Sequence, residues 1–387
     1  MNRSIADTSQ SEDMAALIET VRTFARNELL EADRRWDAGE SSMIEKLGDV
    51  ADMGLMSVTV PEEYGGLGID MRTSAALIRE IAYASPSMAV TLSVHWMVAK
   101  ILNHFASEKH KEEWMQDLAK VDGLAAFAIS EADAGSDVAA VQTRALKVDG
   151  GVRVTGSKMW ISNGLHGRWF LVLVRSDPDA GKAGLSAVLI DGNEDGVERD
   201  LIHGKMGIRG SETVVLHLND VFVPASHFLG SEEDGLKVCL SALDEGRIGI
   251  AAQALGIAEA CFDEMVSYAG QRVQFGQPIG RFQAIQNMIA DSAVELEASR
   301  MLIDRAAWLV DTGHRSSKAS SMAKLFASEA ANRIAYRAVQ VHGGTGYVKE
   351  CRVEQLYRDA RVTTIYEGTS EIQRQVIARE LLEHGVD

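Results

Sequence analysis

Apolar side chains recur at two different spacings along the chain, and the spacing changes twice. In the first third they recur at steps of three and four residues, which gives one apolar face of a helix. Helical patterns continue to about Lys120, with a turn-rich loop at 61–70. The clearest set comprises Met14, Leu17, Ile18, Val21, Phe24 and Ala25.

Between about 123 and 230 the spacing falls to two, which is the period of a β-strand. Within 144–164, Asp149-Gly150-Gly151 separates two short alternating runs and predicts a hairpin. An antiparallel sheet or a small barrel is therefore expected. Further strands are expected within 169–177, 183–192 and 212–224.

From about 235 the helical spacing returns in long stretches, which is typical of a helix bundle. The predicted fold is α+β and multidomain, with an N-terminal helical domain (1–122), a middle antiparallel β domain (123–232) and a C-terminal helix-bundle domain (233–387). The long helices are expected at 236–270, 282–312, 317–342 and 370–384.

Composition narrows the function classes. A formal charge of −17 argues against binding to nucleic acid and to an anionic membrane surface, because both attract basic proteins. Three cysteines without a CxxC pair and ten histidines without HExxH predict no disulfide framework and no metal site, and they fit a cytoplasmic location. The N-terminal sequence has no apolar core, so no signal peptide is expected.

Residues 81–99 carry no formal charge, a run of nearly transmembrane length. Ser85, Pro86 and His95 are among the residues that make it too polar for lipid, so we expect a buried helix and no membrane insertion. Neither GxGxxG after a strand nor GxxxxGK[ST] occurs, so the sequence predicts no Rossmann site and no P-loop.

Near the C-terminus, "TTIYEGTSEIQR" (363–374) places one carboxylate, Glu367, between an apolar pair and a turn. Ser370 and Gln373 have the spacing of a capping box, which predicts a helix beginning near Ser370. Glu367 could simply favour the positive end of that helix dipole. It could instead be a general base in an apolar slot, where desolvation raises the pKa of its carboxyl group. Position alone leaves both interpretations open.

Two stretches could receive a flat or phosphorylated ligand. "FAISEADAGSD" (127–137) allows close backbone approach at its small residues, and "KMWISNG" (158–164) offers Trp160 for stacking. The simpler interpretations are a loop that crosses between domains and a tryptophan in the core.

Three further stretches lie on predicted helices or between them. Asp244 and Arg247, in "SALDEGRIGIAAQALGIAEA" (241–260), share a helix face, either as a surface ion pair or at a ligand. Arg272, in "RVQFGQPIGRFQAIQ" (272–286), suits a pyrophosphate. "AVQVHGGTGY" (338–347) is more simply a helix end.

Six blocks, in this order along nearly the whole chain, resemble those of the acyl-CoA dehydrogenase family: "SEADAGSD", "KMWISNG", "LDEGRIGIAAQALGIA", "RVQFGQPI", "QVHGGTGY" and "RDARVTTIYEGTSEIQR". The pattern is most similar to members that act on short straight-chain acyl groups. The resemblance implies a C-terminal four-helix bundle, FAD between the β domain and the bundle, and a homotetramer. It also implies oxidation of a short- or medium-chain acyl-CoA to the trans-2-enoyl-CoA, with an electron-transferring flavoprotein as acceptor.

Within this resemblance Glu367 aligns with the catalytic base that removes the α-proton. Its backbone N–H, together with a flavin ribityl hydroxyl, would stabilise the enolate oxygen. Substrate contacts are implied for Ser136, Asp244, Arg247 and Gly368. FAD contacts are implied for Phe127, Ala128, Ile129, Ser130, Gly135, Ser136, Trp160, Ile161, Ser162, Thr369, Ser370 and Glu371, and, from a neighbouring subunit, for Arg272, Gln283, Gln340, Val341, His342, Gly343 and Gly344.

Two positions depart from the family pattern or refine it. Ala132-Asp133 stands where the family usually has Pro-Gly, which adds a charge beside the flavin site. Gly246 stands where isovaleryl-CoA dehydrogenase carries its base, so Glu367 is expected to be the sole base and Glu245 to point away. The alternatives are a dehydrogenase of 2-methyl-branched or longer acyl-CoA, a flavin oxidase or monooxygenase on the same scaffold, and a non-catalytic scaffold that binds a protein.

Overall fold

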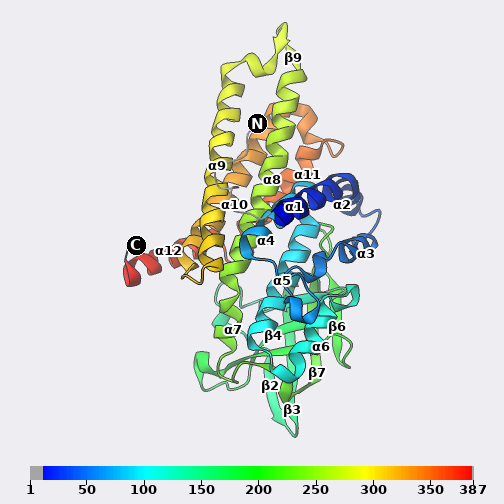
Figure 1. The fold of residues 1–387 in the computed structure, drawn as a ribbon, viewed down its shortest axis with the longest axis vertical. Coiled ribbons are helices and arrows are strands. Elements are labelled where there is room, and N and C mark those ends of the chain that lie inside the picture. The colour runs from blue at the N-terminus through cyan, green and yellow to red at the C-terminus, as the bar shows by residue number, and fades with distance from the viewer. Residues whose placement is uncertain (1–11, 386–387) are drawn as a thin grey trace.

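The computed structural model describes residues 12–385, which Figure 1 shows as a ribbon. Residues 1–11, where no signal peptide is expected, lie outside them. The helices are α1 (Glu12–Phe24), α2 (Leu30–Ala38), α3 (Ile44–Asp52), α4 (Met71–Ala84), α5 (Pro86–Phe105), α6 (Glu108–Leu118), α7 (Gly235–Ser241), α8 (Leu243–Gln271), α9 (Gln283–Asp311), α10 (Ser317–His342), α11 (Arg352–Val362) and α12 (Ser370–His384). The strands are β1 (Ala125–Ala128), β2 (Arg144–Val148), β3 (Gly151–Ile161), β4 (Trp169–Arg175), β5 (Leu185–Asp191), β6 (Val197–Leu201), β7 (Val214–Pro224), β8 (Phe228–Leu229), β9 (Val273–Gln274) and β10 (Gln277–Pro278).

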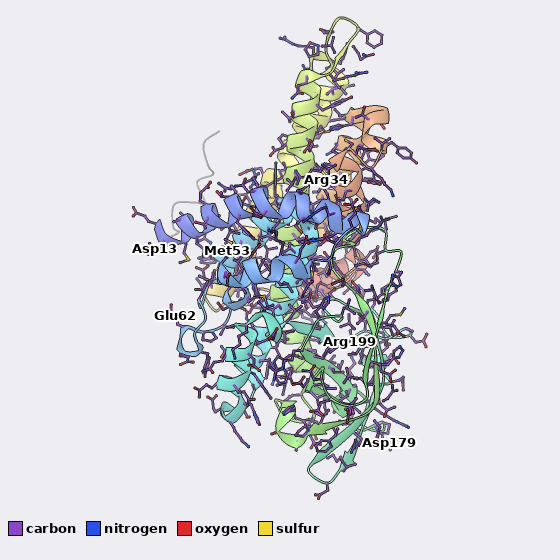
Figure 2. All side chains as sticks on the ribbon, turned by 90° about the vertical axis from the view of Figure 1, so that its right-hand side faces the viewer. Asp13, Arg34, Met53, Glu62, Asp179 and Arg199 are labelled. Atoms are coloured by element: carbon purple, nitrogen blue, oxygen red, sulfur yellow. The ribbon has the colours of Figure 1, made fainter. Side chains whose placement is uncertain are left out.

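The helices form one long body, and the large sheet lies at one end of it (Figure 1). At the other end, α8, α9 and the loop that carries β9 project beyond the remaining elements. Figure 2 shows the same division after a quarter turn, with Asp179 and Arg199 in the sheet region and Arg34 among the N-terminal helices. The predicted order of helices, sheet and helices is confirmed.

One hydrophobic core unites the N-terminal helices with the C-terminal bundle. Ile18 and Val21, from the predicted apolar face of α1, are buried in the same cluster as residues of α8 and α10. α4 approaches α8 closely, because a Cβ on Gly256 would fall 2.4 Å from the carbonyl oxygen of Arg79. Glycine at this position therefore allows the two helices to touch.

The uncharged segment 81–99 is buried as expected, but it is not a single helix. α4 ends at Ala84 and α5 begins at Pro86, because Ser85 is extended and its Oγ accepts a hydrogen bond from the Met88 N–H (3.0 Å). A serine cap followed by proline is a helix-start signal that the sequence already carries. In the part of the chain that the structure describes, every helix is too short or too polar to span a membrane.

The middle region forms an eight-stranded sheet in the order β6-β7-β3-β2-β4-β5-β8, with β1 beside β4. The predicted hairpin is confirmed, since β2 and β3 pair antiparallel with Val148 opposite Gly151. The antiparallel expectation holds for most pairs, and the two exceptions both involve β4, which runs parallel to β1 and to β2. The polar strand β6 was not predicted.

β4 and β5 are buried on both faces. Trp169 and Leu171 of β4 share a cluster with α5 and α6, whereas Phe170 and Val172 share one with β3 and β7. Helices α5 and α6 cover one face of β4, and strands β3 and β7 of the same sheet cover the other. Both faces therefore require apolar side chains. The period of two therefore describes the direction of these side chains and not an alternation between core and solvent.

In the bundle, α9, α10 and α12 lie within one residue of their predicted bounds. The stretch predicted as 236–270 is divided at Ala242 into α7 and α8. α11 was not predicted, because its many charged residues obscure the buried face formed by Val353, Leu356 and Ala360.

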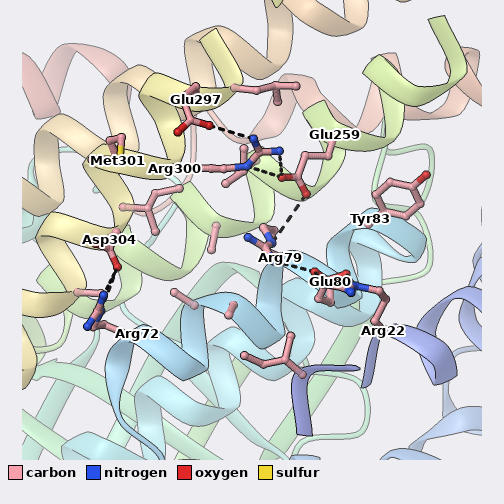
Figure 3. Close-up of a pocket in the computed structure, with 18 of the residues that line it drawn as sticks. Arg22, Arg72, Arg79, Glu80, Tyr83, Glu259, Glu297, Arg300, Met301 and Asp304 are labelled. Carbon is pink, nitrogen blue, oxygen red and sulfur yellow. Dashed lines mark hydrogen bonds and ion pairs between the residues drawn. The ribbon is translucent and has the colours of Figure 1, made fainter. Parts of the chain in front are cut away.

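A large hollow of about 1130 Å³ lies between α1, α4, α8 and α9, and none of the predicted site residues lines it. Figure 3 shows that arginines on its walls are paired with carboxylates, for example Arg300 with Glu259 and Arg72 with Asp304. The positive charges on the walls of this hollow are therefore neutralised by carboxylates of the same walls.

Glu80 is the most buried acid of this network, with 4% of its side chain exposed. It accepts hydrogen bonds from Arg22 (2.9 Å) and Arg79 (2.7 Å). Burial alone would raise the pKa of Glu80, but these arginines outweigh burial and lower the pKa from 4.5 to about 2. The ionised carboxylate thus joins α1 to α4.

We expect Glu80→Gln to destabilise the protein, because Arg22, Arg26 and Arg79 then face a neutral group. The lowered pKa corresponds to a stabilisation on the order of 3 kcal/mol at neutral pH. This stabilisation is complete above pH 4.5, the unfolded value, and is lost as the pH falls towards 2. Melting temperatures of wild type and variant should therefore differ at pH 7 and converge below pH 4.5.

Glu19→Gln is the matched control, because Glu19 pairs with the same Arg22 but is 56% exposed. Exposed ion pairs contribute little, so this variant should melt as the wild type does. Equal melting temperatures for Glu80→Gln and wild type at pH 7 would contradict the assignment.

Candidate active site

Glu367 lies in the turn between α11 and α12 and has a left-handed backbone conformation (φ 52°). Gly368 follows with φ 87°. Positive φ in a residue other than glycine is unfavourable, so neighbouring groups must hold it. The predicted start of α12 is confirmed, but its N-cap is Thr369, whose Oγ1 accepts from the Ile372 N–H (3.3 Å). The predicted capping box of Ser370 with Gln373 was wrong.

Two side chains hold this turn from α10 and α12. Lys324 Nζ donates to the Gly368 carbonyl oxygen (2.7 Å). Gln373 Nε2 donates to the same oxygen (2.9 Å) and to the carbonyl oxygen of Glu367 (3.1 Å). Lys324 is fully buried, and burial lowers its pKa to about 8 although the charge of Glu367 acts in the opposite direction.

The carboxyl group of Glu367 lies beside Gly246 of α8, where a Cβ would be 3.0 Å from Oε2. This oxygen is buried and has no hydrogen-bond partner among residues 12–385. Burial raises the pKa of Glu367, and the charges of Arg247 and Lys324 oppose that rise. An unpartnered buried carboxylate oxygen is costly and rare, so it points to a functional role.

Asp244 and Arg247 form the predicted ion pair (2.7 Å), but the pair is not on the surface. Arg247 is 7% exposed and contacts the Ser321 hydroxyl (3.4 Å), while the Ser317 hydroxyl donates to Asp244. The Nε of Arg247 has no partner in the described part of the chain. A buried guanidinium with a spare donor is available to a polar group of a ligand.

An apolar cluster joins the β region to the Glu367 turn. Phe127, at the end of β1, and Tyr366 both pack against a cluster that includes Val94 and Ile250. The Tyr366 hydroxyl donates to Gln253 of α8. The structure therefore brings the beginning of the 127–136 stretch next to the residue that precedes Glu367.

The loop that follows β1 is fixed from within. Glu131 Oε1 accepts hydrogen bonds from the buried Lys158 (2.8 Å) and from the Thr143 hydroxyl (2.6 Å). Reciprocal backbone hydrogen bonds between Glu131 and Ala134 (3.0 and 3.2 Å) close a tight turn. Ala132-Asp133 lies exposed at the corner of this turn, so it forms a closed loop where the family usually has Pro-Gly.

Trp160, at the end of β3, has φ 64° and is 58% exposed, so the interpretation as a core residue was wrong. The Met159 N–H donates to the Ser130 carbonyl oxygen (2.8 Å), which places the indole beside the 130–136 loop. A Cβ on Gly135 would meet no atom within 4 Å. An exposed indole beside a loop with free space at Gly135 fits a flat ring such as the isoalloxazine of FAD. Next to it Ile161 is buried and Ser162 is half-buried.

Thr369, Ser370 and Glu371 directly follow the Glu367 turn at the start of α12. The cofactor residues predicted to act on a neighbouring subunit lie at the opposite end of the bundle. α8 and α10 run parallel, with Asp244 beside Ser317 at one end and Tyr268 stacked on His342 at the other (ring centroids 4.2 Å apart). Arg272 follows α8 at the projecting tip (Figure 1). A helix of 29 residues is roughly 43 Å long. Arg272 and Glu367 of one chain therefore cannot belong to one compact site.

Gln283 begins α9 at the same tip and is exposed, as Arg272 is. α10 ends at His342, and Gly343 (φ 59°) is its C-cap, so the simpler interpretation as a helix end is confirmed. Val341 and His342 are buried, whereas Gln340, Gly343 and Gly344 are exposed. In a single chain, this far group (Arg272, Gln283 and Gln340 to Gly344) thus presents side chains at 272, 283 and 340 and backbone at 343–344 to solvent.

Lys324 and Gln373 are site residues that the sequence reasoning missed. For Lys324 a signal was present, because "SSMAKLFASEAA" (320–331) places one lysine on a face of small residues that are buried. A charge on such a face needs a partner. For Gln373 the apparent capping box concealed the actual bonds to the turn.

Three family models match the chain in order. They are described as acyl-CoA dehydrogenase, N-terminal domain (11–122), middle domain (126–221) and C-terminal domain (233–382). The chain therefore belongs to the acyl-CoA dehydrogenase family, a family of oxidoreductases, and the resemblance inferred from the six blocks is confirmed.

Individual relatives agree with the family over nearly the full length. An acyl-CoA dehydrogenase of Bacillus subtilis (strain 168) is 41% identical over 96% of this chain and 98% of its own length. Butyryl-CoA dehydrogenase from Megasphaera elsdenii superposes with a TM-score of 0.94 at 34% identity, covering 99% of this chain and 100% of that one. A chain from the structure described as "Electron transferring flavoprotein of Acidaminococcus fermentans: Towards a mechanism of flavin-based electron bifurcation" gives a TM-score of 0.95 at 35% identity, with 97% and 100% covered.

We expect Lys324→Met to move the acid limb of the pH profile of kcat/KM to higher pH. Lys324 is charged below about pH 8, and its charge lowers the pKa of Glu367, so its removal lets that pKa rise. The shift should be on the order of one pH unit. Steady-state rates with one acyl-CoA across pH 5 to 9 would measure it (roughly the stable range of most proteins).

Gln373→Leu is the matched control, because it also removes a donor to the Gly368 carbonyl oxygen but changes no charge. It should lower kcat and leave the acid limb in place. If both variants lowered kcat without any movement of the acid limb, the electrostatic role of Lys324 would be refuted and only its hydrogen bond would remain.

Proposed function

We propose that this protein is an FAD-dependent acyl-CoA dehydrogenase that oxidises a short-chain acyl-CoA to the trans-2-enoyl-CoA, with Glu367 as the base. The observation that carries the proposal is the buried, unpartnered Oε2 of Glu367 beside Gly246. The likeness to butyryl-CoA dehydrogenase supports a short acyl group. Glycine at 246 supports Glu367 as the sole base, which argues against the isovaleryl type of branched-chain enzyme.

Removal of the α-proton requires a base that is close, oriented and poorly solvated, because the α-carbon of a thioester is only weakly acidic. Glu367 meets these conditions, since burial raises its pKa and the turn fixes its backbone. The positive charges of Arg247 and Lys324 oppose that rise and favour the ionised carboxylate. Glu367 therefore takes the α-proton directly onto a carboxylate oxygen.

The enolate that forms needs hydrogen-bond donors at the thioester oxygen. The backbone N–H of Glu367 donates to no acceptor within residues 12–385. It is therefore free to bind this oxygen. Asp244 and Arg247 would position the polar part of the substrate, and Ser136 and Gly368 would contact it.

FAD, when bound, would supply the acceptor for the hydride that leaves the β-carbon. The 127–136 stretch and Trp160 to Ser162 would hold its ring system, and residues 369–371 would contact it beside the base. Arg272, Gln283 and Gln340 to Gly344 would hold the cofactor of another subunit, because they lie too far from Glu367 of their own chain.

A second copy of the chain is thus part of each site, in the homotetramer that the family resemblance implies. Exposed apolar side chains on the bundle support such contacts, because monomers rarely leave many of them open. They include Val294, Met301 and Trp308 of α9 and Tyr336 of α10. The match to a chain of the electron transferring flavoprotein structure supports a flavoprotein of that kind as electron acceptor.

We expect Glu367→Gln to retain FAD and to lose turnover by roughly 10³-fold, because the amide cannot accept the α-proton. Dye-coupled oxidation of butyryl-CoA and the flavin absorbance of the purified protein would measure both. Glu383→Gln, a carboxylate that is 58% exposed at the end of α12, should leave both unchanged. Near-normal rates in Glu367→Gln would eliminate this mechanism.

We expect Arg272→Ala to lower the flavin content, whereas Arg281→Ala in the same projecting loop should not. Co-expression of Arg272→Ala with Glu367→Gln should recover activity that neither variant has alone. One mixed site then combines Glu367 from one chain with Arg272 from the other. Absence of recovery in isolated mixed oligomers would show that each chain completes its own site.

A further inference from the structure

A small recess of about 30 Å³ lies between α4, α5 and α8, beside Glu367. Gly246 and Met97 connect the recess to Glu367, because both residues line the recess. A Cβ on Gly246 would lie 3.0 Å from Glu367 Oε2 and 3.0 Å from the sulfur of Met97. Gly249, one turn further along α8, also lines it. A volume of this size holds about two water-sized groups.

An ion pair bridges the walls of this recess. Lys100 Nζ of α5 lies 2.5 Å from Glu245 Oε2 of α8, and Lys100 also contacts the sulfur of Met71 (3.8 Å). Both charged side chains line the recess, and only about a quarter of each is exposed (27% and 29%). Glu245 thus points to α5, in agreement with the expectation that it turns away from the base.

The recess has a further polar group. The hydroxyl of Ser74, which lines it, is buried and has no partner among residues 12–385. An alkyl chain that extended past Gly249 would cover this hydroxyl and the ion pair. Covering them would remove their access to water without giving them new partners, which is unfavourable.

We propose that the Lys100–Glu245 ion pair determines acyl-chain length by closing the recess that receives the end of the acyl group. This inference rests on the proposed function and deepens it, because it assigns the preference for short chains to two named residues. Short acyl tails end before the pair, whereas longer tails must displace it.

The test compares wild type with the double variant Lys100→Ala/Glu245→Ala, because removal of one partner alone would leave an unpaired charge. The ratio of kcat/KM for octanoyl-CoA to that for butyryl-CoA should be low in wild type and rise at least tenfold in the double variant. Lys100→Met/Glu245→Gln removes the charges at similar size, protects the test against a folding defect, and should shift the ratio in the same direction.

Lys46→Ala/Asp49→Ala removes another lysine–carboxylate ion pair (2.9 Å), on α3, and should leave the ratio unchanged. Dissociation constants of 2-butenoyl-CoA and 2-octenoyl-CoA, measured by calorimetry, should shift in parallel with the rates. This binding needs no turnover. If the protein oxidised no acyl-CoA, the proposed function would be refuted, but the binding constants would still test the role of the ion pair.

Three outcomes would overturn the proposal: an unchanged ratio in both double variants, a wild type that already handles octanoyl-CoA as well as butyryl-CoA, or a wild-type preference for glutaryl-CoA that Lys100→Ala abolishes. The last outcome would make Lys100 a receptor for a second carboxylate instead of a barrier.

Discussion

The site depends on a turn that the chain would not adopt unaided. Glu367 and Gly368 both have positive φ, and the hydrogen bonds to their carbonyl oxygens come from Lys324 and Gln373. Because the ammonium group of Lys324 is fully buried, it contributes both a directed bond and a positive charge close to the base. One residue thus couples the geometry of the turn to the pKa of the carboxyl group that it carries.

The three parts of the fold meet at this turn. The helices that precede the sheet in the sequence share one core with the helices that follow it. As a result, α5 and α8 lie side by side and form the walls next to Glu367. The sheet adds Phe127 to the apolar cluster beneath Tyr366 and holds Trp160 outward beside a closed loop. A desolvated carboxylate and a short recess therefore lie together, although they come from distant segments.

Much of this arrangement could be predicted from the sequence. Apolar spacing located the long helices and the strands β2, β3, β4, β5 and β7, and the six blocks identified the family and directed attention to Glu367. The helix break at Ser85 was also legible, since a serine followed by proline starts a helix. Local patterns failed where tertiary contacts decide the outcome. The burial of Asp244 with Arg247, and the bonds of Lys324 and Gln373 to the turn, depend on which helices pack together.

The division of the cofactor residues has the same cause. In the sequence, Arg272 and Asp244 are only 28 positions apart, but a straight helix separates them by its full length. Closeness in the sequence therefore does not indicate which residues of one chain share a site. The family resemblance had grouped Arg272 with Gln340 to Gly344, and the parallel course of α8 and α10 shows why these residues lie together.

The most direct test of the central claim is hydrogen exchange into butyryl-CoA in D₂O, with the enzyme fully reduced so that oxidation cannot proceed. If Glu367 is the base for the α-carbon, deuterium enters carbon 2 and not carbon 3, as mass spectrometry and NMR would show. Deuterium at carbon 3, or no enzyme-dependent exchange at all in an enzyme that turns over under oxidising conditions, would contradict the account.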